Sequence, residues 1–176
     1  MIPARSQNLP DHAELAMRTA LTDLQLDYAY GIDMRDWERY RAVFADVVEF
    51  DFTSWYGGEP VLIKADDWVE QVRHRQSGFD GTQHLMSNHR FARDDGDAIG
   101  TTYVVARHYL RIDGEHHVQA IGGCYHNRYI ETEAGWKIAA CKLGVLWTQG
   151  DPDLFRIASE RWAAASNTVC QSLDQT

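Results

Sequence analysis

Residues 28–37 read YAYGIDMRDW and separate two helical patterns from a chain that is mainly β beyond them. The side chain of Asp33 lies at this junction. An acid in such a place is either a helix-end residue in water or a buried catalytic group. Which of the two it is decides what the protein does.

On the N-terminal side, apolar residues recur at helical spacing and predict a helix over residues 12–30. Asp11 and Glu14 have the form of a capping box at its start, and Gly31 is a plausible stop. On the other side, Asp36 is predicted to cap a second helix. The apolar face of that helix comprises Trp37, Tyr40, Val43 and Phe44.

Further along, β-branched and aromatic residues predict a strand over residues 47–55, and residues 65–76 return to helical spacing. The chain after Gly78 is predicted to be mainly β, with Asp-Gly hairpin signals between strands. Gly122-Gly123 in mid-strand indicates a bulge or bend. The four long strands are expected at residues 82–93, 98–112, 115–131 and 136–147.

Helices followed by a meandering sheet predict an α+β fold, with the helices on one face of a mostly antiparallel, curved sheet. We expect one domain over residues 1–176. Residues 1–10 are predicted to be an arm, and residues 151–176 a C-terminal helix and tail. If the sheet curls, its concave face and the helices enclose a pocket.

Composition limits the class of partner. The net charge of -9 makes a nucleic-acid partner an unfavourable hypothesis. No signal-peptide pattern and no membrane-length apolar run occurs, and three Cys without a C-x-x-C pair are typical of reduced thiols. A cytoplasmic protein that does not enter a membrane is therefore expected.

Hairpin register predicts which polar residues share the pocket. A first hairpin centred near Gly96 places His84 opposite Arg107 or His108. The second hairpin places His108 opposite Gln119, and Tyr103 opposite Cys124. Strand alternation puts His84, Met86 and Asn88 on one face, without indicating whether that face is concave.

Common cofactor and metal motifs are absent from the sequence. Neither H-x-H nor H-E-x-x-H occurs, so a histidine metal site is not expected. The G-x-S-x-G, P-loop and G-x-G-x-x-G patterns are also missing. We expect chemistry with no cofactor and no metal.

Four segments carry a resemblance to a known family. YGIDMRDWERYRAVFADVVEFDF, GTQHLMSNHRF, ARHYLRI and GWKIAACKLGVLW resemble the SnoaL-like branch of the NTF2-like superfamily. Similar members are scytalone dehydratase, bile-acid 7α-dehydratase and the hexachlorocyclohexane dehydrochlorinase LinA. The resemblance covers roughly residues 12–163.

The resemblance implies a cone of helices and curved sheet around a pocket. It implies that Asp33 hydrogen-bonds His84, and that His84 removes a proton from substrate. It places His108 at a second active-site histidine, and Tyr28 where the bile-acid enzyme carries a catalytic tyrosine. It also implies a homo-oligomer, with a trimer favoured over a dimer.

The sequence departs from scytalone dehydratase around the Asp33–His84 pair, which we call the dyad. Ile32 and Phe52 stand where that enzyme has tyrosines, and Cys124 and His126 approximately replace a serine and an asparagine. The basic dyad is kept while the substrate-orienting groups differ, which argues against scytalone itself as the substrate. The residues expected to contact substrate are Tyr30, Phe52, Trp55, Met86, Asn88, Tyr103, Cys124, His126 and Trp147.

The function expected from these observations is a cofactor-independent lyase of the dehydratase type, acting on a hydrophobic aromatic, polyketide-like or steroid-like small molecule. Double-bond isomerisation and release of formaldehyde are alternatives in the same pocket. Two alternatives of other classes are a non-catalytic β-subunit of an aromatic-ring dioxygenase and a small-ligand binding protein.

Overall fold

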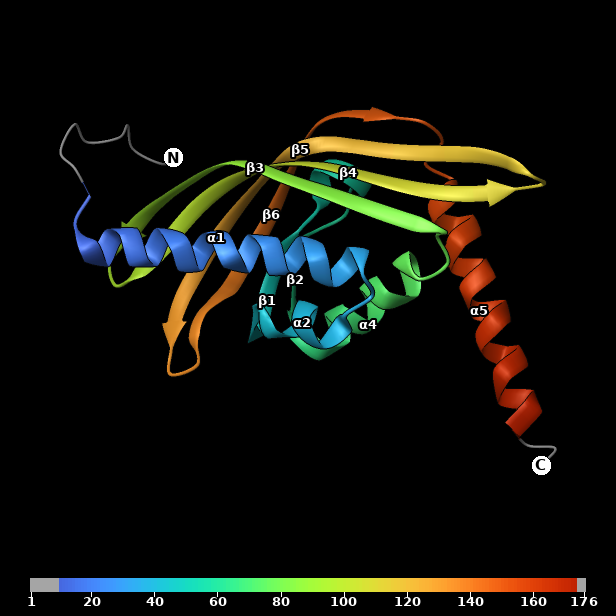
Figure 1. The fold of residues 1–176 in the computed structure, drawn as a ribbon, viewed down its shortest axis with the longest axis horizontal. Coiled ribbons are helices and arrows are strands. Elements are labelled where there is room, and N and C mark those ends of the chain that lie inside the picture. The colour runs from blue at the N-terminus through green and yellow to red at the C-terminus, as the bar shows by residue number, and fades with distance from the viewer. Residues whose placement is uncertain (1–9, 174–176) are drawn as a thin grey trace.

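A single open sheet of six strands forms the body of the protein (Figure 1), and the computed structural model describes residues 10–173 of the chain. The strand order is β2-β1-β6-β5-β4-β3; β1 runs parallel to β6 and the other neighbours are antiparallel. The strands are β1 (Phe44–Asp51), β2 (Val61–Lys64), β3 (Gly81–Asp94), β4 (Asp97–Ile112), β5 (Glu115–Thr132) and β6 (Gly135–Gln149). The predicted arm at residues 1–10 falls almost wholly outside the described residues.

Helices gather on one side of this sheet, as the α+β prediction requires. In Figure 1, α1 crosses the sheet with α2 and α4 beside it, while α5 projects away from the sheet. The helices are α1 (His12–Asp33), α2 (Trp37–Ala42), α3 (Thr53–Tyr56), α4 (Ala65–Gln76) and α5 (Leu154–Leu173). The α+β fold is therefore that of an NTF2-like cone. No helix in the described part of the chain is long and apolar enough to cross a membrane.

The first helix is longer than predicted because Gly31 does not end it. Gly31 lies inside α1, where an added Cβ would come within 2.8 Å of Tyr40. The glycine thus allows close approach of α2. The helix ends at Asp33, and the next turn places Arg35 in a left-handed conformation with φ of 60°. Gly31 therefore extends α1 far enough to carry Asp33 over the sheet.

The segment predicted as a strand over residues 47–55 is divided in the structure. The strand β1 begins earlier, at Phe44, and ends at Asp51, whose Oδ1 accepts hydrogen bonds from the backbone and hydroxyl of Thr53. These bonds begin the short helix α3, which carries Trp55. A local hydrogen bond from the backbone to a side chain therefore competes with the β propensity of the sequence here.

A bulge changes the register of the first hairpin. His84 pairs with Ala106, one position from the predicted partner, because the register shifts between Ser87 and Arg90. Asn88 occupies the extra position with φ of 52°. The second hairpin matches the prediction, with His108 opposite Gln119. The predicted irregularity at Gly122-Gly123 is confirmed by a register shift between β5 and β6.

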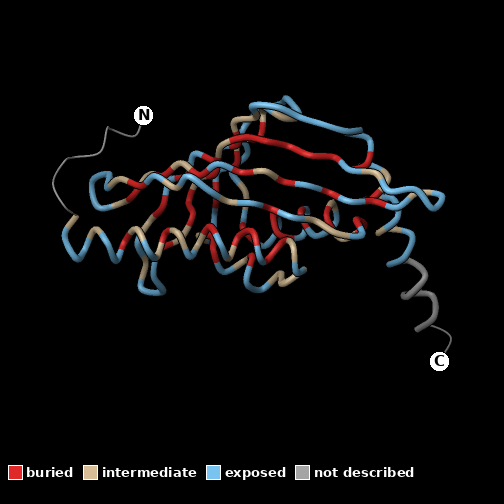
Figure 2. Tube along the Cα trace, turned by 45° about the horizontal axis from the view of Figure 1, so that its top comes forward, coloured by how far each residue is buried: buried red, intermediate tan, exposed pale blue. Residues whose placement is uncertain are grey.

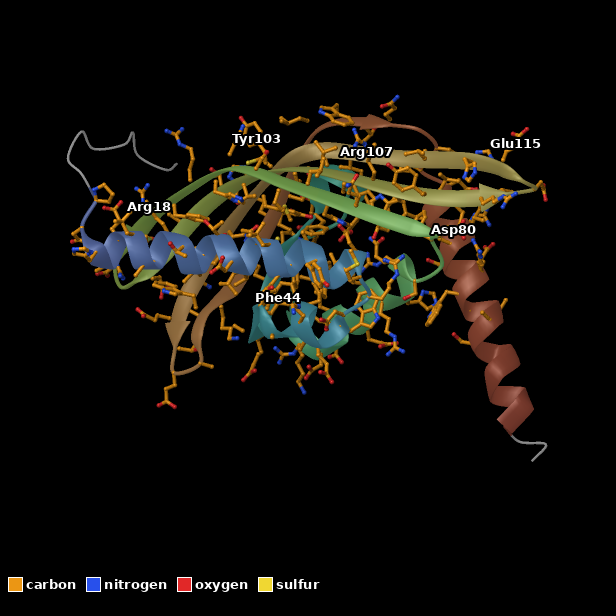
Figure 3. The ribbon with its side chains drawn as sticks, in the orientation of Figure 1. Arg18, Phe44, Asp80, Tyr103, Arg107 and Glu115 are labelled. Carbon is orange, nitrogen blue, oxygen red and sulfur yellow. The ribbon has the colours of Figure 1, made fainter. Side chains whose placement is uncertain are left out.

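The core lies between the helices and the concave face of the sheet, where Figure 2 shows the buried segments concentrated. It is strongly aromatic: Phe50 stacks on Trp68 at 3.7 Å between ring centroids, and Tyr28 meets Tyr40 and Phe44 edge-on. Figure 3 shows Phe44 on this helical side, with Tyr103 and Arg107 on the opposite side of the sheet. Side chains that face the helices can therefore form an enclosed site.

Candidate active site

Asp33 and His84 are brought into contact by the end of α1 and the edge strand β3. The Nδ1 atom of His84 lies 2.7 Å from Oδ1 of Asp33. The backbone N–H of His84 donates to Oδ2 of the same carboxylate at 2.7 Å. The side chain of His84 is only 5% exposed, and that of Asp33 is 14% exposed. The acid at the helix junction is thus a largely buried, histidine-bound carboxylate.

A third donor completes the environment of Asp33. The hydroxyl of Thr82 donates to Oδ1 at 2.9 Å. Burial by itself raises the pKa of Asp33, but the hydrogen bonds and charge of His84, with the bond from Thr82, outweigh it and lower the pKa below the usual value. Asp33 is therefore ionised at neutral pH, and it selects the tautomer of His84 that carries the proton on Nδ1.

An apolar cavity lies on the other side of His84. Its empty space, with the open mouth included, is about 590 Å³. Phe155 from the first turn of α5 closes one wall by packing against Trp55 and His108. The lining residues are Tyr28, Ile32, Tyr40, Phe52, Trp55, Trp68, Val72, Arg75, Gln76, His84, Val104, Ala106, His108, Ile121, Tyr125, Leu143 and Phe155.

Tyrosine hydroxyls provide polar groups in this apolar cavity. Tyr28 donates to the hydroxyl of Tyr125 at 3.3 Å, and the indole N–H of Trp68 donates to Tyr40 at 3.1 Å. Burial raises the pKa of Tyr28, Tyr40 and Tyr125, so all three hydroxyls remain protonated. Because Tyr125 accepts from Tyr28, its own proton can be donated to a ligand.

His108 is the second imidazole in the cavity, with its ring centroid 5.6 Å from that of His84. Burial, followed by repulsion from His84, lowers the pKa of His108 to about 3, so its ring is neutral. Its Nδ1 lies 3.4 Å from the carbonyl oxygen of Gln119 and must carry the proton, since a carbonyl only accepts. Nε2 is buried without a partner among the described residues and is a hydrogen-bond acceptor.

Several predicted site residues are brought together by the fold. Tyr28, Phe52, Trp55, His84 and His108 all line the cavity. Asp33 lies behind His84 and borders an open groove on the outer side of α1. Met86 is half-buried and packs against the aromatic core. The catalytic set predicted from the sequence is therefore contiguous in space.

The other predicted contact residues lie outside the cavity. Tyr125 faces inward, so Cys124 and His126 on either side of it face outward. Asn88 is exposed because it occupies the bulge. Three aromatic side chains, 44% to 49% exposed, also lie outside: Tyr30 on α1, Tyr103 on β4 and Trp147 on β6.

Sequence reasoning missed several polar residues of the site. Tyr125 and Gln76 line the cavity, while Thr82 and Arg35 support Asp33. Tyr125 had a signal, because the predicted second hairpin and strand alternation put it on the same face as His108. Arg35 had none, since its role depends on a left-handed backbone turn. Among residues 10–166, whose side chains the structure describes, no group of three His, Cys, Asp or Glu residues converges as a metal site.

A buried Asp-His pair beside an apolar cavity in a helix-and-sheet cone defines the class of this protein. The chain belongs to the SnoaL-like family, whose model matches residues 13–142. Proteins similar to this chain include a scytalone dehydratase by sequence and a hexachlorocyclohexane dehydrochlorinase by fold.

Individual relatives are distant. Scytalone dehydratase arp1 of Aspergillus fumigatus is 25% identical over 148 residues, covering 79% of this chain and 88% of the relative. The crystal structure of Kfla4162 from Kribbella flavida has a TM-score of 0.75 at 25% identity, covering 81% of this chain and 98% of that one. Hexachlorocyclohexane dehydrochlorinase LinA-type3 from Novosphingobium barchaimii has a TM-score of 0.62 at 22% identity, covering 78% and 92% of the two chains.

Proposed function

We propose that this protein is a dehydratase-type lyase that uses Asp33 and His84 to remove a proton from a carbon beside a carbonyl group. The observation that carries the proposal is the 2.7 Å contact between Oδ1 of Asp33 and Nδ1 of His84. Because Nδ1 is occupied by Asp33, Nε2 of His84 is left to act as the base. The cavity that His84 lines is where the substrate would bind.

The dyad has the properties that this reaction needs. Asp33 holds the imidazole in one tautomer and stabilises the imidazolium that forms when the C–H proton is taken. Electrons then pass through the enolate, and the leaving group departs from the next carbon. The His84 imidazolium can return its proton to the leaving oxygen, so that water is the second product. Every proton in this cycle is supplied by the substrate or the dyad.

The neutral tyrosines and His108 in the cavity are suited to further roles. The free proton of Tyr125 can stabilise the developing enolate oxygen, with Tyr28 donating to Tyr125 behind it. His108 presents a bare Nε2, so it is suited to accept a hydrogen bond from a substrate hydroxyl. A cyclic, mainly apolar substrate that carries a carbonyl and a hydroxyl group therefore matches the chemistry of the residues that line the cavity.

Isomerisation and elimination share the first proton transfer and differ only in the fate of the enolate. The contact between Asp33 and His84 favours both over a non-catalytic subunit, which does not require a base against an apolar cavity. Loss of water is the proposed outcome because the Aspergillus fumigatus relative is a dehydratase. Proton removal and loss of water can be measured separately with two substrates.

Two ring compounds test the proposal. The first is 3-hydroxy-1-tetralone, which gives fluorescent 1-naphthol on loss of water; the second is 1-tetralone, which lacks the leaving group and reports proton removal by deuterium exchange at C2. We expect both reactions to be catalysed. Asp33→Asn and His84→Phe should each lower the rates by about 1000-fold, in the range of general base catalysis.

The matched control is Asp27→Asn, the same change on the same helix at a carboxylate that pairs with Arg39. It should leave both rates unchanged. Exchange without elimination would support the base and contradict the dehydratase assignment. Rates in Asp33→Asn and His84→Phe equal to those of the unmodified protein would contradict the dyad itself.

A further inference from the structure

The turn after α1 contains a strained residue whose side chain points back to the dyad. Arg35 has φ of 60°, a conformation that costs a residue other than glycine about 1 kcal/mol or more. Residues in such conformations concentrate at functional sites, where the surrounding structure holds them. The contacts of Arg35 indicate what the strain accomplishes.

The guanidinium of Arg35 joins three segments. Its Nη1 donates to the carbonyl of Ile32 at 2.9 Å and to the hydroxyl of Thr82 at 3.0 Å. Its Nη2 donates to the carbonyl of Phe79 at 3.3 Å. The first contact is a second bond to the Ile32 carbonyl at the end of α1, which also accepts from the backbone N–H of Arg35. Phe79 lies on the connection into β3, and Thr82 lies within β3 itself. Arg35 thus links the helix that carries Asp33 to the strand that carries His84.

The contact with Thr82 also has a direction. A hydroxyl has one proton, and an arginine cannot accept a hydrogen bond. Because Thr82 accepts from Arg35, its proton is left for Oδ1 of Asp33, at 2.9 Å. Arg35 therefore donates to Thr82, and Thr82 donates to the Asp33 carboxylate that holds His84.

We propose that Arg35 is a positioning residue that acts through Thr82 to orient the Asp33 carboxylate and keep it ionised. The proposal rests on the proposed function only for its catalytic consequence. Burial lowers the pKa of Arg35 and the charge of Asp33 opposes this, so the guanidinium remains charged and its field reaches the carboxylate. By the same coupling, the cation favours the ionised form of Asp33.

The first test needs no substrate. Carbon-13 NMR of the Asp33 carboxyl group is followed against pH in the unmodified protein and in Arg35→Met, which keeps the aliphatic stem and loses every donor. Thr82→Val and the double variant are measured in parallel. We expect each single substitution to raise the pKa of Asp33 towards its usual value, and the double variant to raise it by less than the sum.

Two further variants separate charge from fold. Arg35→Lys keeps a cationic donor and should restore the pKa of Asp33 close to that of the unmodified protein. Arg39→Gln removes a neighbouring arginine that pairs with Asp27 and Asp36 on the surface, and should change nothing at Asp33. Thr82→Val leaves the contacts of Arg35 with backbone carbonyls in place, so it tests the relay even if Arg35→Met unfolds the turn.

The second test uses deuterium exchange of 1-tetralone. Arg35→Met should lower the exchange rate by about 10- to 100-fold, as expected for a small displacement of a catalytic base. The acid limb of its pH profile should move to higher pH, because a cation that favours the ionised carboxylate is gone. Arg35→Lys should recover most of the rate.

Two results would overturn the proposal: a pKa of Asp33 that is the same in Arg35→Met as in the unmodified protein, or effects of Arg35→Met and Thr82→Val that add in full. Either would make Arg35 only a clamp between segments. If Asp33→Asn keeps its activity while the NMR results are as expected, the proposed function fails and the positioning of the carboxylate stands.

Discussion

Two polar clusters lie between α1 and the sheet, and they differ in charge. At mid-helix, Gln25 donates to the hydroxyl of Tyr129 at 2.9 Å, and Asn127 donates to the same hydroxyl at 3.2 Å. Two helical turns later, the carboxylate of Asp33 binds His84. The first cluster is neutral and the second is ionic, although one helix carries both.

The difference lies in how completely each cluster is hydrogen-bonded. Gln25 Oε1 and Asn127 Oδ1 are buried without a partner among the described residues. The carboxylate of Asp33 receives three donors, because an unpaired buried charge costs far more than an unpaired amide oxygen. The neutral cluster anchors the helix, whereas the ionic cluster has a strained turn and a cavity beside it. Only the second has the properties of a functional site.

The largest expected effect is a loss of stability at low pH through His108, which lies beside His84 in the cavity. The pKa of His108 is about 3 in the folded protein and about 6.5 in the unfolded chain. Between these pH values the unfolded chain binds more protons than the folded protein, so the free energy of unfolding rises with pH. For His108 the slope is about 1.4 kcal/mol per pH unit below pH 6.5. Between pH 6.5 and 4.5, we therefore expect the free energy of unfolding of the unmodified protein to fall by about 2 kcal/mol more than that of His108→Phe.

Urea unfolding at the two pH values measures this difference. His126→Phe is the matched control, because it makes the same change at an exposed histidine. Equal losses in the unmodified protein and His108→Phe would mean that His108 is not held neutral in the folded state.

The neutral cluster should respond to the loss of its shared hydroxyl. Tyr129→Phe leaves the amide donors of Gln25 and Asn127 buried without their acceptor. We expect a loss of about 1 to 2 kcal/mol in the free energy of unfolding by urea. Deuterium exchange of 1-tetralone should be unchanged, and a fall in that rate comparable to Asp33→Asn would show that the clusters are not separate.

The smallest expected effect comes from Gln25→Met, which changes only the neutral cluster. The substitution removes one donor to Tyr129 and, at the same time, the unpartnered Oε1 atom. Because these contributions oppose each other, the free energy of unfolding should change by less than about 1 kcal/mol. A loss larger than that of Tyr129→Phe would contradict this assignment of the cluster's energetics.

The sequence was a good guide where a pattern is local. Asp11 accepts from the backbone N–H of Glu14, and Asp36 from that of Arg39, as the capping patterns predict. The helix over residues 65–76 matches α4. Family resemblance also paired Asp33 with His84. Local periodicity could not have done so, because the two residues are far apart in the chain.

Prediction was wrong where neighbours in space decided the outcome. Gly31 lies inside α1, where it leaves room for Tyr40 on α2, a contact that no local pattern contains. The bulge at Asn88 moved His84 opposite Ala106. The pairing of β5 with β4 was predicted correctly, but the sequence did not indicate which face of these strands is concave, and Cys124 lies outside the cavity.

The sequence by itself determined the helix caps, the hairpins and the presence of an acid at a helix junction, because these depend on residues close together in the chain. Tertiary structure decided that this acid is largely buried against His84, which proton His84 carries and which strand residues face the cavity. Arg35 shows the distinction most clearly. Its side chain acquires a role only because a left-handed turn directs it across to Thr82 on another element.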